Sequence, residues 1–191
     1  VSAIQHANAM DYKVFLVPLD SVWVGYERPV ETRLQSRRIT NYWYSYEPYV
    51  IAAEQNGVEQ LAVATEATWL EDHALPALWN NLIALIHASY HGLLTYDMNW
   101  VPTVPTLPSW MKNPLLSSIG FSEYMPLAAQ GQVVLPDDIP ARWKQTVEPV
   151  VDGIAEQLHK PIILSEVGYR ATSDALSSPW LTTSTAPVDP A

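Results

Sequence analysis

The sequence contains no cysteine, which excludes disulfide bonds, cysteine-ligated metal sites and a thiol nucleophile. It also lacks any apolar run approaching the roughly 18 residues of a membrane-spanning helix, so no membrane partner is expected. Residues 1–10 lack the charged start and apolar centre of a signal peptide. Because the chain begins at Val1 rather than Met, we expect its natural N-terminus to lie outside these residues, and the compartment stays open.

Positive charge is scarce, because ten Lys and Arg residues face twenty Asp and Glu residues and the formal net charge is −10. The electrostatic field of a chain with this negative charge repels phosphate backbones and argues against nucleic acid as a partner. The GxGxxG, Walker and GxSxG motifs are all missing, which weakens nucleotide-dependent and serine-hydrolase interpretations. With 191 residues, 48% of them hydrophobic, the chain predicts one globular domain with a sizeable core.

The aromatic residues are unevenly divided, with two Phe against eight Trp and ten Tyr. Trp and Tyr join a flat apolar face to a hydrogen-bonding edge, which suits cores, interfaces and sugar-binding clefts. For any single ring a position in the core is the commoner outcome. The places of these rings along the chain must therefore separate the alternatives.

Five short apolar runs predict buried strands, because each is rich in aliphatic or β-branched residues and is bounded by polar or turn residues. Helical patterns lie between them and cover residues 49–56, 76–91 and 143–158. This alternation predicts an α/β fold with parallel strands and right-handed crossovers. The five runs are residues 13–19, 60–65, 93–98, 117–122 and 161–165.

In such a fold the residues that follow each strand share one rim, where barrel and doubly wound enzymes place their sites. Long segments after three of the strands, residues 20–46, 123–140 and 167–191, are expected to be loops that form a substrate cleft. The predicted rim contains carboxylates, an amide and aromatic rings: Asp20, Trp23, Glu66, Trp69, Asn99, Trp100, Glu123, Tyr124, Glu166 and Tyr169.

Two carboxyl groups on one rim can divide the work of glycoside hydrolysis, one as proton donor and the other as nucleophile. Glu66 and Glu166 fit this division, and ordinary strand-end carboxylates in salt bridges remain the alternative. Stacking of sugar rings on the rim aromatics would explain the group Trp23, Trp69, Trp100, Tyr124 and Trp180. As a set, these rings favour a carbohydrate cleft.

His87 and His91 are four residues apart on a predicted helix, a spacing that can chelate a metal. The glutamate of the metalloprotease helix motif is missing between them, and no third ligand is evident nearby. We therefore expect no metal site and interpret both residues as helix-end histidines that interact favourably with the helix dipole.

Several motifs in a fixed order resemble glycoside hydrolase family 113: GVEQLAVATE (57–66), GLLTYDMNW (92–100), SSIGFSEYMPL (117–127), KPIILSEVGYR (160–170) and PW (179–180). The resemblance covers about residue 11 to 190. It implies a (β/α)8 TIM barrel of the large clan of retaining glycosidases, a family known mainly for β-mannanases. The chain would then be one catalytic barrel domain over residues 1–191 that needs no cofactor.

By this resemblance Glu66 holds the acid/base position after barrel strand four, and Glu166 holds the nucleophile position after strand seven. Tyr124 matches a tyrosine that contacts the nucleophile. The resemblance also gives Asn99, Trp100 and Trp180 as substrate-binding positions. Further substrate contacts are expected from rings at the strand ends: Trp23, Trp69 and Tyr169.

The sequence departs from the family pattern at three points. Ala64 replaces the usual Gly before Thr-Glu, and Val17 and Leu19 flank Pro18 where the family tends to carry a basic residue and a His. The five strands also correspond to strands three to seven, so strands one, two and eight are expected to lie outside these residues. A barrel that is partial at both ends exposes strand edges, which favours self-association.

The leading hypothesis is a retaining, endo-β-mannanase-like glycoside hydrolase that cleaves β-linked glycans, above all β-1,4-mannan or mannooligosaccharides, with a polysaccharide or oligosaccharide as its partner. One alternative is a non-catalytic carbohydrate-binding remnant of such a barrel. Another is a hydrolase or lyase for an unrelated substrate, which would need only the strand-end carboxylates.

Overall fold

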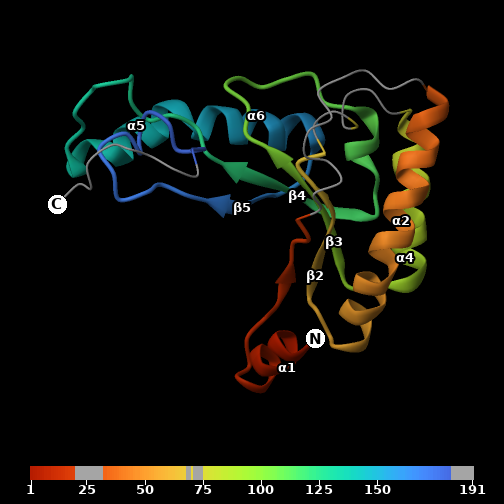
Figure 1. Cartoon of the computed structure of the whole chain (residues 1–191). Helices are drawn as coiled ribbons and strands as arrows, with labels where there is room; N and C mark the ends of the chain where they lie inside the picture. The colour runs from red at the N-terminus through yellow and green to blue at the C-terminus, as the bar shows by residue number, and fades with distance from the viewer. Residues whose placement is uncertain (20–31, 68–69, 71–74, 182–191) are drawn as a thin grey trace.

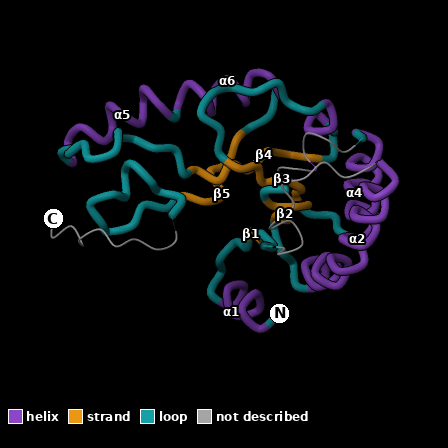
Figure 2. The backbone as a smooth tube through the Cα atoms, turned by 45° about the horizontal axis from the view of Figure 1, so that its top comes forward, coloured by secondary structure: helices purple, strands orange, loops and turns teal. Residues whose placement is uncertain are grey.

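The computed structural model describes residues 1–19, 32–67, 70 and 75–181. Its five strands form one sheet in the order β1-β2-β3-β4-β5, and every neighbouring pair is parallel. The sheet curves, with helices along its outer side (Figure 2). The predicted α/β class and partial barrel are therefore confirmed. The strands are β1 (Phe15–Leu16), β2 (Gln60–Thr65), β3 (Leu93–Asn99), β4 (Leu116–Glu123) and β5 (Ile162–Val167).

Four strands begin and end within two residues of the sequence prediction, whereas the first is much shorter than residues 13–19. The run that follows it contains Pro18, which has no N–H to donate to a ladder, and Leu19 is exposed. β1 consequently pairs with β2 at two positions only, Phe15 with Gln60 and Leu16 with Leu61.

Five α-helices and two 3-10 helices accompany the described strands. α2 and α4 lie side by side along one flank of the sheet, and α5 and α6 follow one another along another flank (Figure 1). Within the described segments no helix is long and apolar enough to cross a membrane. The helices are α1 (Ser2–Ala9), α2 (Thr32–Gln55), α4 (Pro76–Ser89), η1 (Ser109–Lys112), η2 (Pro136–Asp138), α5 (Ile139–Thr146) and α6 (Glu148–Leu158).

The loop expected over residues 20–46 is wrong for its second half, because α2 begins at Thr32 and includes Pro48 in its interior. A stripe of buried residues at helical spacing explains the long helix, since it packs one face of α2 into the core. The stripe consists of Ile39, Tyr42, Tyr46, Val50 and Ala53.

The single helix predicted over 143–158 is divided at Val147, between α5 and α6. Pro149 lies in the first turn of α6, where its missing N–H costs little but where it favours a new helix start. A buried stripe continues through the break and consists of Val147, Val150, Ile154 and Leu158. The predicted burial of these residues is therefore confirmed, whereas the prediction of one continuous helix is wrong.

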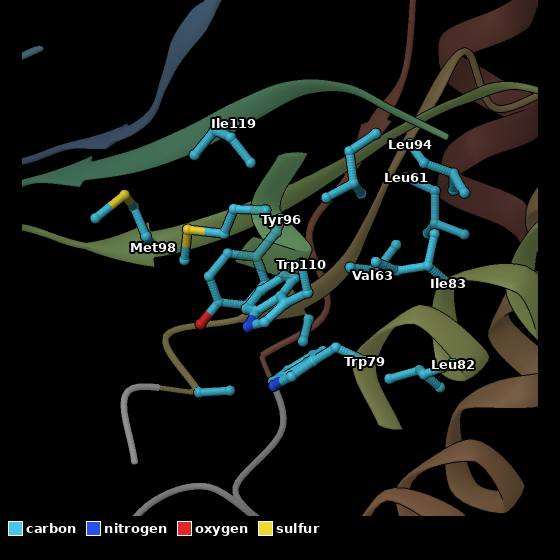
Figure 3. Close-up of a cluster of buried hydrophobic side chains, with 14 of the residues drawn as sticks. Leu61, Val63, Trp79, Leu82, Ile83, Leu94, Tyr96, Met98, Trp110 and Ile119 are labelled. Atoms are coloured by element: carbon cyan, nitrogen blue, oxygen red, sulfur yellow. The ribbon is translucent and has the colours of Figure 1, made fainter. Parts of the chain in front are cut away.

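The two faces of the central strands differ in polarity. On β3, Leu94, Tyr96 and Met98 belong to the hydrophobic core, whereas Thr95 and Asp97 alternate with them and face the other way. The core face carries an aromatic cluster (Figure 3), in which the Trp79 and Trp110 rings stack with centroids 4.4 Å apart. Tyr96 meets both indoles edge-on.

The opposite face of the sheet is lined by buried polar side chains, and it leads to the rim with the candidate site. Gln60 donates to the Ser118 hydroxyl at 3.0 Å, and Thr95 donates to the Ser118 carbonyl at 2.9 Å. Asp97 and Ser122 lie further along the same face and are fully buried. The hydrogen bonds among Gln60, Thr95 and Ser118 offset the loss of water around those three side chains.

Candidate active site

Two strands are irregular immediately before the glutamates predicted to act together. Between β2 and β3 the register shifts between Ala62 and Thr65, one residue before Glu66. Between β4 and β5, Phe121 pairs with Leu164 and Ser122 pairs with Glu166, which leaves Ser165 as the extra residue of a bulge. Bulges change the direction of the side chains that follow them and occur frequently next to active sites.

Glu66 adopts a left-handed backbone conformation, with φ at 47°, that a non-glycine residue seldom occupies. Its N–H donates to the carbonyl of Asp97 at 2.8 Å, which fixes the turn at the end of β2. Burial raises the pKa of the Glu66 carboxyl, the Ser122 hydroxyl lowers it, and the charge of Glu166 raises it further. The net rise favours a protonated Glu66 at higher pH than an ordinary glutamate.

Glu166 lies near the end of β5 and accepts a hydrogen bond from the Tyr124 hydroxyl at 3.0 Å on Oε2. Burial and this contact with Glu166 raise the pKa of Tyr124 to about 12, so the phenol remains a donor at neutral pH. Gly168 makes the arrangement possible, because a Cβ there would lie 2.8 Å from Cε1 of the Tyr124 ring.

The two glutamates open onto one cavity of about 430 Å3. Trp100 and Trp180 form an aromatic wall, with stacked rings whose centroids are 5.5 Å apart at an interplanar angle of 24°. Trp180 is 45% exposed, so this wall reaches solvent. The cavity is lined by Glu66, Asn99, Trp100, Tyr124, Glu166 and Trp180, all of which were predicted as site residues.

Tyr169 lies beside the site rather than in the cavity lining. Its hydroxyl is 2.9 Å from both Glu123 Oε2 and the Met125 carbonyl. Glu123 is fully buried and also accepts from the Met125 N–H at 2.9 Å. Burial raises the pKa of Glu123, and these two hydrogen bonds lower it. The observed contacts of Tyr169 anchor the chain after β5 to the end of β4, and a substrate contact for it stays a prediction.

Trp23, Trp69 and Asp20 lie outside the residues that the structure describes. Asn99 is placed by its own backbone turn, since its Oδ1 accepts from the Trp100 N–H at 2.8 Å. The structure thus brings six of the predicted residues around one cavity, and their catalytic and binding roles remain predictions.

Asp97 is the residue beside the site that the sequence prediction passed over. It lies within the apolar run 93–98, and its pKa is raised to about 7, chiefly by burial. The desolvation argument that singled out Glu166 applies equally to a carboxyl group inside a buried strand, so this signal was present. Its partner Ser165 gave no comparable signal, because a serine before a strand-end glutamate is unremarkable.

The two histidines considered above as a metal-chelating pair have different surroundings. His91 follows α4 rather than ending it, and its Nδ1 pairs with Glu54 Oε1 at 2.9 Å on the surface. Across the described parts of the chain no group of three potential protein ligands surrounds a common metal position. The helix-end interpretation therefore suits His87 only, which lies in the last turn of α4.

The sequence model of Glycoside Hydrolase Family 113 matches residues 1–191. The GH113 β-mannanase AaManA from Alicyclobacillus acidocaldarius, solved in complex with ManMIm, superposes with a TM-score of 0.75 at 26% sequence identity. That superposition covers 98% of this chain and 56% of AaManA.

A solved GH113 β-1,4-mannanase superposes with a TM-score of 0.72 at 20% identity, over 98% of this chain and 57% of its own, and supports the fold alone. No curated protein matches the chain significantly. The chain spans a little over half the length of the solved structures it resembles.

Proposed function

Because the chain belongs to glycoside hydrolase family 113, we propose that it carries the two-glutamate centre of a retaining glycosidase for β-linked glycans. The favoured substrates are β-1,4-mannan and mannooligosaccharides. The observation that carries this proposal is the shared cavity of Glu66 and Glu166, with the Tyr124 hydroxyl on the second carboxylate. Two carboxyl groups at one cavity are the minimum that the double-displacement reaction requires.

In the first step Glu166 attacks the anomeric carbon, and the bond to the glycosidic oxygen breaks as Glu66 gives that oxygen its proton. The products are a covalent glycosyl ester on Glu166 and a free leaving-group alcohol. In the second step Glu66, now ionised, takes a proton from water, and the water oxygen attacks the same carbon. Glu166 is released as a carboxylate, and the anomeric configuration is retained.

The environments of the two carboxyl groups support this division of roles. Burial keeps Glu66 protonated to higher pH, as a general acid requires. The Tyr124 phenol stabilises the charged form of Glu166 through a hydrogen bond, which also fixes the direction of the carboxylate. Trp100 and Trp180 offer ring faces to the apolar faces of sugar residues along the cavity.

The test is the release of reducing ends from β-1,4-mannan and from defined mannooligosaccharides. We expect turnover by the unaltered chain, none by Glu166→Ala, and strongly reduced turnover by Glu66→Ala. Glu156→Ala is the matched control, because Glu156 is an exposed carboxylate on α6. With an aryl β-mannoside whose leaving group needs no proton, added azide should restore product formation in Glu66→Ala as a β-glycosyl azide and in Glu166→Ala as an α-glycosyl azide.

Three outcomes would count against the proposal. Binding of mannooligosaccharides without product, unchanged by Glu66→Ala, would identify a non-catalytic carbohydrate-binding remnant. Unchanged hydrolysis by Glu166→Ala would remove the nucleophile assignment. Turnover of another substrate, with every β-glycan inert, would support the more general hydrolase or lyase hypothesis.

A further inference from the structure

Asp97 occupies a position between the two glutamates on the polar face of the sheet. Its side chain is fully buried, and it comes from β3, a strand that carries neither glutamate. A fully buried carboxyl group costs substantial free energy through desolvation unless neighbouring groups compensate. The proposed reaction assigns no step to Asp97, so its place in the structure needs another explanation.

Asp97 is hydrogen-bonded to both irregular strand ends. Its carbonyl accepts from the Glu66 N–H at 2.8 Å, at the turn that follows the β2 irregularity. Its carboxyl Oδ1 accepts from the hydroxyl of Ser165, the extra residue of the β5 bulge directly before Glu166. One residue of β3 therefore contacts the two segments that determine where the glutamates point.

The contact with Ser165 passes over β4, because β3 and β5 are not neighbours in the sheet. Gly120 of β4 pairs with Asp97 on one side and with Ile163 on the other. A Cβ on Gly120 would lie 2.8 Å from Asp97 Oδ1 and 2.9 Å from Ser165 Oγ. The missing side chain at Gly120 thus leaves the space in which these two groups meet.

We propose that Asp97 is a positioning residue that links the two bulged strand ends and so fixes the separation of Glu66 and Glu166. This inference rests on the proposed function for its kinetic consequence. Its structural part concerns contacts within the folded chain and can be tested without turnover.

The charged groups around Asp97 favour the neutral form. The negative charges of Glu66, after β2, and of Glu166, on β5, both oppose the ionisation of Asp97. The titratable group that follows β4 in the chain is the Tyr124 phenol. Burial is the largest cause of the raised pKa, and the Ser165 hydroxyl only partly offsets it. Below a pH of about 7 the neutral form of Asp97 prevails, so it adds no third negative charge beside Glu166 while still accepting a hydrogen bond from Ser165.

The kinetic test is a double-mutant cycle in Asp97→Ala and Ser165→Ala. A misplacement of about 1 Å can lower a rate on the order of 100-fold, so each single variant should lower kcat by about 10- to 100-fold with KM changed less than about threefold. Because both remove the same link, the double variant should be no more than about threefold slower than Asp97→Ala. Asp97→Asn, which keeps a neutral acceptor, should retain most of kcat.

Thr95→Val is the matched control, because Thr95 is equally buried on the same face of β3 but contacts Ser118. It should leave kcat within about threefold and combine additively with Ser165→Ala. The positioning role would be overturned if the losses of kcat in Asp97→Ala and Ser165→Ala multiplied in the double variant. It would also be overturned if Thr95→Val lowered kcat as much as Asp97→Ala does.

A second test needs no activity and therefore separates this inference from the proposed function. Asp97 has a raised pKa in the folded state, so its contribution to stability is fully present below its unfolded value of about 3.9 and is lost as pH rises to about 7. Between these two pH values, ionisation of Asp97 should lower the folding equilibrium constant of the unaltered chain by up to about tenfold per pH unit. Asp97→Asn should lack this additional pH dependence. Equal slopes in urea titrations would overturn the neutral-acid assignment, even if mannan hydrolysis fails.

Discussion

At the scale of single residues, the segment Glu-Val-Gly-Tyr at 166–169 combines three functions in four positions. Glu166 faces the cavity, Gly168 leaves space for the Tyr124 ring, and Tyr169 binds the buried Glu123. The segment joins the end of β5 to the end of β4 through two tyrosine hydroxyls. Its specificity as a sequence motif therefore has a physical basis in packing as well as in the proposed chemistry.

The Tyr124 hydroxyl should matter for turnover and little for folding. Tyr124→Phe removes the donor to Glu166 and keeps the ring against Gly168. A hydrogen bond to a charged group contributes about 1.5 to 3 kcal/mol, so kcat/KM for mannooligosaccharides should fall by about 10- to 100-fold. Tyr49→Phe, at an exposed tyrosine of α2, serves as control. Full activity in Tyr124→Phe would show that this contact does not assist the nucleophile.

Glu66 should determine how activity declines at alkaline pH. Since its pKa is raised, the protonated form that donates to the leaving group persists above the usual glutamate range, and kcat/KM falls as pH rises through that pKa. An aryl glycoside whose leaving group needs no proton bypasses this requirement. With such an aryl glycoside, kcat/KM of the Glu66→Ala variant should show no decline at alkaline pH that is caused by loss of the Glu66 proton. With mannooligosaccharides, whose leaving group needs the proton, an alkaline decline of kcat/KM left unchanged by Glu66→Ala would contradict the acid assignment.

The two glutamates of the candidate site could be predicted from the sequence, but the contacts that hold them in place could not. Apolar runs followed by Glu66 and Glu166 can be recognised in the sequence because burying a carboxylate is costly. The extra residue Ser165 cannot be recognised in this way, since a bulge depends on pairing with a neighbouring strand. The contact over Gly120 depends on three strands at once, which no local pattern records.

At the scale of secondary-structure elements, α2 supports the strand that carries Glu66. The hydroxyls of Tyr42 and Tyr46 donate to the carbonyls of Val63 and Ala62, in the first case at 2.8 Å. These carbonyls lie beyond the positions at which β1 pairs with β2, and within the irregular register with β3. The helix thus supplies hydrogen bonds in a region where the described ladder is interrupted.

Removal of one of these hydroxyls should destabilise the fold measurably. Tyr42→Phe leaves the buried Val63 carbonyl without its tyrosine donor, which should lower the free energy of unfolding by about 1 to 3 kcal/mol. Tyr44→Phe is the control, because Tyr44 is exposed on the same helix and should change stability by less than about 0.5 kcal/mol. Urea denaturation of both variants measures the difference. Equal stabilities would show that the helix contributes packing alone.

Strands were easier to predict than helices for a physical reason. Central parallel strands are short continuous apolar runs between turn residues, and four of the five were placed closely. α2 was recognised only at its end, because Pro48 and several charged and polar residues interrupt the pattern along its exposed face. The spacing of Tyr42, Tyr46, Val50 and Ala53 by three and four residues was the signal that identifies its buried face.

At the scale of the whole molecule, β5 is a terminal strand of the described sheet and pairs on one side only, with β4. Two of its apolar side chains are exposed, Leu164 at 39% and Val167 at 53%. A terminal strand with unpaired backbone groups and apolar side chains favours association with another chain. The net charge of −10 opposes such association between copies, and this repulsion is weakened by salt.

We therefore propose that the 191-residue chain, taken by itself, self-associates through the β5 edge and that salt strengthens the association. Sedimentation velocity should show the mean molecular mass rising with protein concentration, and more steeply at 1 M salt, where the Debye length falls to about 3 Å. Leu164→Lys places a charge on the strand and should shift the distribution toward monomer at every concentration. Leu85→Lys adds the same charge at an exposed leucine of α4 and should shift it far less. A monomer at all concentrations, or equal effects of the two lysines, would mean that the β5 edge is not the site of association.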